Sequence, residues 1–150
     1  AHEHGVGRLN VAIEGTTVAM TFEAPGADIV GFEYAAESDT DLAAIDAAVA
    51  TLGAPLELFV MPGAAGCSTV ETQAKLESED KHDAQGVDGH TDFHAEYTLT
   101  CDTPNALTEI TFAYFETFPY AQEVEVQIIT AAGAQAFEVE RDTPVLDLGG

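Results

Sequence analysis

The five histidines of this 150-residue chain lie in two short stretches of the sequence. His2 and His4 are among the first four residues, whereas His82, His90 and His94 lie in and just after a polar segment. Neither stretch has the apolar neighbours that a histidine buried in a core would have. Neutral imidazole and carboxylate groups both bind Zn²⁺ at about 2.0–2.2 Å and combine in tetrahedral sites. The distribution of histidines therefore indicates a transition-metal site.

The first pair of histidines precedes a predicted β-hairpin. Apolar and polar residues alternate over residues 7–24, interrupted at Gly15 and Thr16, as in two half-buried strands joined by a tight turn. His2 and His4 have the parity of the polar face of the first strand. Both imidazoles are thus expected on the solvent side of a sheet. A frayed terminus or the remnant of an affinity tag is the alternative explanation for this pair.

A second predicted strand, residues 93–101, carries His94 on its polar face, two residues before Glu96. If the first strands of the two halves lie side by side in the sheet, His2 and His4 converge with His94 on one ion. Glu96 then supplies a carboxylate. The remaining histidines, His82 and His90, are expected nearby on a flexible arm. The alternative is that they are exposed to solvent and bind no ion.

The other elements predict an α+β fold. Helical spacing and caps indicate one main helix at about 39–52, and composition indicates a strand at 56–61 that pairs with 67–77. In 67–77, Val70 is expected to share a face with Thr72, Ala74 and Leu76. The second half repeats the order of two strands, a connector and two strands. We therefore expect one antiparallel, β-rich domain over residues 1–150, with pseudo-twofold β-β-α-β-β repeats at about 7–77 and 92–146 and a mobile acidic loop at about 78–92.

The charge of the chain excludes several classes of partner. Asp and Glu number 27 and Lys and Arg number 4, so the formal charge is −23. Nucleic-acid backbones and anionic membrane surfaces are bound mainly by basic residues, so neither is an expected partner. No run approaches the ~20 apolar residues of a membrane span. With 46% hydrophobic residues, the chain is nevertheless apolar enough to fold.

The two cysteines, Cys67 and Cys101, lack the C-x-x-C spacing of redox motifs and zinc fingers. We expect them to form a disulfide, with two buried free thiols as the alternative. Disulfides persist in oxidising compartments. Together with a small first residue, Ala1, which suits cleavage by signal peptidase, this predicts a periplasmic protein whose signal peptide has been removed.

Several short motifs, in this order and spacing, resemble the ZrgA-like family of periplasmic zinc-binding proteins. They are HEHG at 2–5, ADIVGFE at 27–33, LFVMP at 58–62 before Cys67, FHAEY at 93–97 before Cys101, and FETFP at 115–119. The resemblance implies an exported accessory protein that binds zinc and passes it to the solute-binding protein of a zinc ABC transporter. It also implies that the metal chemistry lies at His2, His4, His94 and the loop histidines.

Four other functions are alternatives to zinc binding. The α-amino group of Ala1 together with His2 can chelate Cu²⁺, which outcompetes Zn²⁺ at most N and O sites. A metal-free acidic scaffold or adhesion module also fits the charge. An enzyme is disfavoured, since no H-E-x-x-H, G-x-S-x-G or P-loop motif is present. Calcium is disfavoured because the loop acids do not follow the EF-hand order.

Overall fold

The computed structural model describes residues 6–29, 38–78, 91–118 and 120–148. The strands are β1 (Val6–Glu14), β2 (Thr17–Pro25), β3 (Phe59–Val60), β4 (Cys67–Ser78), β5 (Thr91–Cys101), β6 (Glu109–Phe112), β7 (Glu123–Thr130), β8 (Gly133–Glu140) and β9 (Val145–Asp147). The helices are α1 (Gly26–Ile29), α2 (Asp39–Leu52), α3 (Pro55–Leu58) and α4 (Tyr114–Thr117), with 3₁₀ turns η1 (Gly63–Ala65) and η2 (Pro104–Ala106).

The strands form two sheets. The larger sheet has six strands in the order β4-β5-β2-β1-β7-β8, and the smaller has three in the order β3-β6-β9. All pairings are antiparallel except that of β1 with β7, which is parallel. The predicted α+β class, rich in antiparallel strands and with one main helix, is confirmed.

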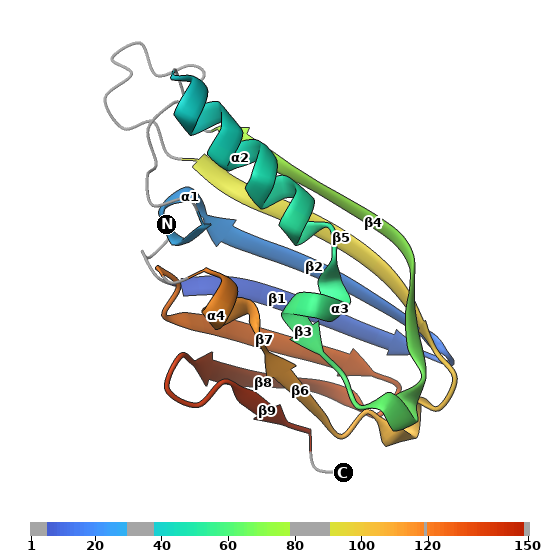
Figure 1. The fold of residues 1–150 in the computed structure, drawn as a ribbon. Helices are drawn as coiled ribbons and strands as arrows, with labels where there is room; N and C mark the ends of the chain where they lie inside the picture. Colours follow the sequence, from blue (N-terminus) through green and yellow to red (C-terminus); the bar gives the residue numbers. More distant parts are fainter. Residues whose placement is uncertain (1–5, 30–37, 79–90, 119, 149–150) are drawn as a thin grey trace.

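The expected hairpin is formed by β1 and β2 (Figure 1). Its turn contains Gly15 at φ 62°, a left-handed conformation that glycine adopts without steric cost. Alternate residues of both strands are buried, among them Leu9 and Phe22, at 0% exposure. The alternation of apolar and polar residues therefore determines which face of the large sheet packs against the core.

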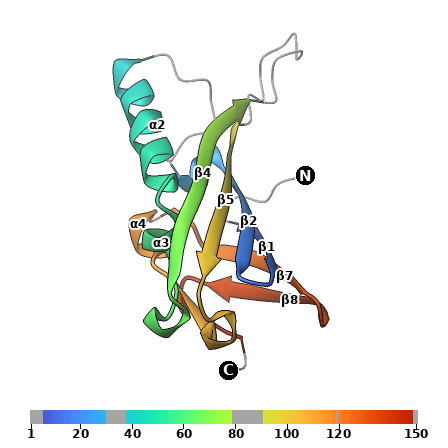
Figure 2. The ribbon, with the colours of Figure 1, turned by 90° about the vertical axis from the view of Figure 1, so that its right-hand side faces the viewer.

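The helices cover one face of the large sheet, which we call the inner face (Figure 2). Between this face and the helices lies an aromatic cluster centred on Phe59. The Phe59 ring centroid is 5.5 Å from that of Phe22 and 5.3 Å from that of Phe112. All three side chains are buried, so this cluster supplies a large share of the hydrophobic stabilisation.

Local hydrogen bonds position α2 across the inner face. Ser38 Oγ accepts a hydrogen bond from the backbone N–H of Asp41 at 3.1 Å, which caps the first turn. At the other end, the Tyr97 hydroxyl of β5 donates to the carbonyl oxygen of Leu52 at 2.6 Å. Burial raises the pKa of Tyr97 above the ordinary tyrosine value. This bond ties the end of α2 to the middle of β5.

The disulfide expected from the sequence is present between Cys67 and Cys101. These residues face each other in register at the start of β4 and the end of β5. The bond therefore fastens the edge strand β4 to its neighbour.

Three predictions about the middle of the chain are wrong. Residues 56–61 are not one strand: helix α3 begins at Pro55, whose fixed φ suits the first helical position, and only the two residues of β3 follow. Residues 67–77 pair with β5 and not with 56–61. In addition, a register shift between Thr69 and Glu71 turns Val70 out of the expected face, and its exposure is 62%.

The predicted loop 78–92 falls mostly outside the described residues. Ser78, Thr91 and Asp92, at its two ends, belong to β4 and β5. The pseudo-repeats stay a prediction. The pair that opens the first half, β1 and β2, is a hairpin, whereas β5 and β6 lie in different sheets. Among the helices of the described segments, none combines the length and the apolar character needed to cross a membrane.

Candidate metal site

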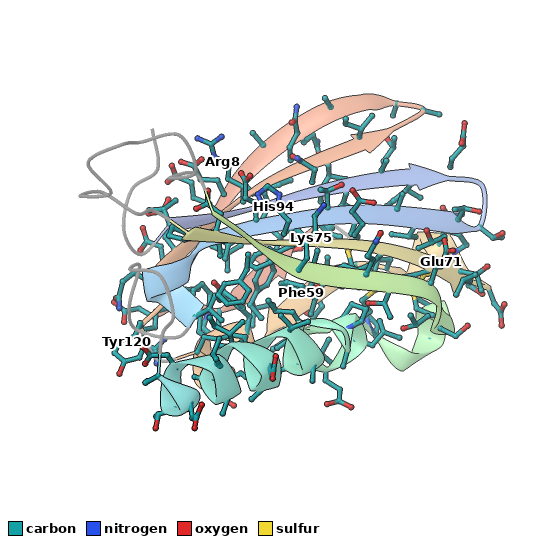
Figure 3. The ribbon with its side chains drawn as sticks, turned by 90° about the horizontal axis from the view of Figure 1, so that it is seen from above. Arg8, Phe59, Glu71, Lys75, His94 and Tyr120 are labelled. Carbon is teal, nitrogen blue, oxygen red and sulfur yellow. A yellow bond between two sulfur atoms is a disulfide. The ribbon has the colours of Figure 1, made fainter. Side chains whose placement is uncertain are left out.

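The outer face of the large sheet, opposite the helices, carries most of the polar side chains of its strands. Cross-strand register aligns six charged or titratable residues, one from each strand, and we call them the charged row. In strand order they are Lys75, His94, Glu23, Arg8, Glu125 and Glu138. Figure 3 shows Arg8, His94 and Lys75 on the side of the sheet away from α2, whereas Phe59 lies on the side of the helix.

His94 has an acidic neighbour within this row. Its Nε2 atom lies 3.1 Å from Oε2 of Glu23, which is directly opposite on β2. The two side chains are 28% and 29% exposed, so both are partly shielded and still reachable from solvent. Sequence reasoning missed Glu23, because the contact joins residues 71 positions apart and only the register of β2 against β5 brings them together.

Two further acids share the polar face of β5 with His94. Asp92 is 2% exposed, and it is the one buried acidic side chain among the described residues. Glu96, the predicted carboxylate ligand, is exposed, and its partners in register are Thr21 and Gln73. Residues two apart on a strand are about 6.6 Å apart. The acid in contact with His94 is therefore Glu23, and a ligand role for Glu96 stays a prediction.

The other four predicted ligands lie outside the described residues: His2, His4, His82 and His90. The condition for their convergence with His94, that the opening strands of the two halves are neighbours, is not met, because β2 lies between β1 and β5. Both strands are antiparallel to β2, so they run in the same direction and begin at the same end of the sheet. Two strand spacings, about 9.5 Å, separate them. Any shared site must reach across the end of β2.

A second group of acids lies at the β7 and β8 end of the charged row and includes two of its members. Carboxylate oxygens of Glu123, Glu125 and Glu138 lie within 4.8 Å of one another on β7 and β8. Arg8 Nε is 3.6 Å from Oε1 of Glu125, and both side chains are well exposed. Such exposed pairs contribute little to stability. The sequence gives only a weak signal for this group, the alternation of glutamates in a predicted hairpin.

The disulfide is remote from His94. Cys101 is seven residues further along β5, a distance of about 23 Å. Both sulfur atoms are held in the disulfide, so neither is a thiolate ligand. The chemistry at the other end of the strand is therefore that of imidazole and carboxylate, a donor set that suits zinc.

Comparison with known proteins supports this assignment. The family model described as "ZrgA family zinc uptake protein" matches residues 1–148, essentially the whole chain. A search of curated proteins finds no match. This membership favours a zinc-related role over a metal-free scaffold, and the copper alternative rests on Ala1 and His2, outside the described residues. The chain belongs to the ZrgA family of zinc uptake proteins.

Proposed function

We propose that this protein captures Zn²⁺ in the periplasm and passes it to the solute-binding protein of a zinc ABC transporter. Membership of a zinc uptake family carries the first part of the proposal. The disulfide between Cys67 and Cys101 supports an oxidising compartment, as the periplasm is. A role outside catalysis agrees with the family description, which names uptake and no reaction.

In this proposal the ion binds at the end of the sheet where β1 and β5 begin. His94 stands on the outer face near that end, and Asp92 adds a buried carboxylate beside it. In the sequence, His4 comes two positions before the first residue of β1, and His90 immediately before the first residue of β5. The proposed ligands are His2, His4 and His94, with His82 and His90 available for exchange. Three imidazoles and a carboxylate or water complete a tetrahedral zinc site.

The charge of the protein favours capture of a cation. A formal charge of −23 raises the concentration of divalent cations near the surface and speeds their encounter with it. This attraction does not distinguish zinc from magnesium or calcium. Selectivity must therefore come from the imidazoles, which bind zinc far better than they bind the hard cations.

The direct test is zinc binding by the purified, untagged protein, measured by competition with a chelator. We expect nanomolar or tighter affinity at pH 7.5, about −12 kcal/mol. Affinity should fall steeply below about pH 6.5, because histidine side chains take up protons there. Replacing His2, His4 and His94 together by Ala should remove tight binding. Binding no tighter than micromolar by the wild type, or full binding by the triple variant, would refute the proposal.

Delivery is tested separately, by mixing the zinc-loaded protein with the metal-free solute-binding protein of the same organism. The proposal predicts that zinc moves to the acceptor faster than it dissociates into a solution that holds an excess of chelator. Equal rates of transfer and of dissociation would show that the ion is released into solution and then bound by the acceptor. The proposal that this protein captures zinc would then hold, and the proposal of direct transfer would fail.

A further inference from the structure

We propose that Glu23 is a zinc ligand together with His94. The inference rests on the proposed function, since it specifies one carboxylate of that site. It replaces Glu96 in this role with a residue from a different strand, and it draws on the geometry of the outer face of the sheet.

The spacing of the two side chains fits a shared ion. Zinc binds imidazole nitrogen and carboxylate oxygen at about 2.0–2.2 Å, so two ligands at a tetrahedral angle lie about 3.3–3.5 Å apart. The observed separation between His94 Nε2 and Glu23 Oε2 is 3.1 Å. An ion can therefore enter between these atoms when each moves by a few tenths of an ångström.

The backbone holds the pair in this position. Glu23 and His94 face each other in register on β2 and β5, which are both interior strands of the six-stranded sheet. Residues on paired strands are positioned more accurately than residues on loops, which is what a metal site requires. The inner side of the same strands is fixed by buried Phe22 and Phe93.

The neighbouring residues favour Glu23 over Glu96 as the carboxylate that shares an ion with His94. On its β4 side His94 faces Lys75, a cation, so the acid directly opposite in register is the one on β2. Glu96 faces Thr21 and Gln73 instead. A carboxylate that is 29% exposed has also lost part of its hydration, so its attraction for a cation is less screened than that of a fully exposed acid.

A positioning role is the competing explanation. In many zinc sites a histidine binds the ion through one ring nitrogen and donates a hydrogen bond from the other to a carboxylate. Glu23 would then orient His94 without touching the ion. Loss of such a partner typically costs about 10–100-fold in metal affinity and leaves the ligand set unchanged. The two roles therefore differ in the coordination sphere as well as in affinity.

The test compares Glu23→Gln with Glu96→Gln in the full-length protein. Each change removes one negative charge from the same face, so the second is a matched electrostatic control. We expect Glu23→Gln to weaken zinc binding by at least about 100-fold, beyond the loss usual for an orienting partner. It should also alter the visible absorption spectrum of the Co²⁺-substituted protein, because one ligand is lost. Glu96→Gln should change affinity by less than about 3-fold, as expected for an exposed charge, and leave the spectrum unchanged.

Three outcomes would overturn the inference: an unaltered cobalt spectrum in Glu23→Gln, an equal loss in both variants, or a larger loss in Glu96→Gln. If Glu23→Gln does not fold, carbon-13 NMR of the wild type decides, since zinc should shift the carboxylate resonance of Glu23 and not that of Glu96. Zinc binding that is lost in His94→Ala but intact in Glu23→Gln removes this inference alone. Absence of tight binding in the wild type removes the proposed function itself.

Discussion

The two faces of β5 use alternate positions of the same eleven-residue strand for different purposes. On the inner face, Phe93 and Tyr97 are buried against the aromatic cluster and α2. On the outer face, His94 contacts Glu23, and no helix of the described residues covers the pair. Residues of one parity thus stabilise the sheet, and residues of the other parity present ligands at fixed positions.

This difference implies that stability and metal binding can be changed separately. The hydrophobic contacts that hold β2 and β5 together lie on the inner face, so the separation of Glu23 and His94 depends on the sheet and not on the ion. Substitutions on the inner face should lower stability with little change in zinc affinity. Substitutions on the outer face should do the reverse.

The largest expected loss of stability comes from Phe59→Ala. Its ring is fully buried and contacts Phe22 and Phe112, so truncation should lower the free energy of unfolding by about 3–5 kcal/mol. Urea unfolding of the metal-free protein measures this loss. Zinc affinity of the folded variant should stay within about 2-fold of the wild type, as for a change remote from the ligands. A large fall in affinity of the folded protein would show that the two faces are coupled.

Removal of the disulfide by replacing Cys67 and Cys101 with Ala should cost about 2–4 kcal/mol, since the bond closes a long loop in the unfolded chain. The bond lies far along β5 from His94, so the zinc affinity of the folded variant should equal that of the wild type. Thermal unfolding and chelator competition on the same variant check both statements. A variant of wild-type stability would mean that the bond contributes little to the fold.

Tyr97→Phe should lower stability by about 1–3 kcal/mol at pH 7, because the carbonyl oxygen of Leu52 loses its buried donor. Burial raises the Tyr97 pKa in the folded state, so its stabilisation is complete below the ordinary tyrosine pKa near 10 and declines as the pH rises above it. The wild type should therefore lose stability more steeply than Tyr97→Phe between about pH 10 and 12. Denaturant unfolding at a series of pH values measures both slopes, and parallel slopes would assign the alkaline loss to other groups.

The smallest expected effect is that of Lys75→Gln on the outer face. Removing the cation opposite His94 should raise zinc affinity by about 2–3-fold, since a positive charge in this row opposes a bound dication. Stability should change by no more than about 0.5 kcal/mol, because the side chain is exposed. The effect should shrink as salt is added. A lower affinity would indicate that Lys75 supports the site.

Much of the fold was predictable from the sequence, since β1, β2, β5 and β7 each have one buried face and alternate accordingly. Caps at Ser38 and Gly53 likewise marked α2. Residues 56–61 were misassigned, because a short apolar run does not distinguish a strand from a helical turn.

The candidate site was harder to predict than the elements. His94 was identified by its type and parity, but its acidic partner depends on which strand lies beside β5. The choice of β2 and the register of that pairing follow from packing of the whole inner face, a property that local alternation does not encode. Sequence alone therefore indicates Glu96, a carboxylate two positions from His94, and not Glu23, which contacts it in the fold.

Anomalous X-ray diffraction from crystals of the zinc-loaded protein most directly tests whether the ion binds at the His94 end of the outer face. Data on both sides of the zinc absorption edge locate the ion without any assumption about its ligands. The account predicts a peak about 2.0–2.2 Å from Nε2 of His94 and from a carboxylate oxygen of Glu23. A peak at Glu123, Glu125 and Glu138 with none near His94 would contradict it.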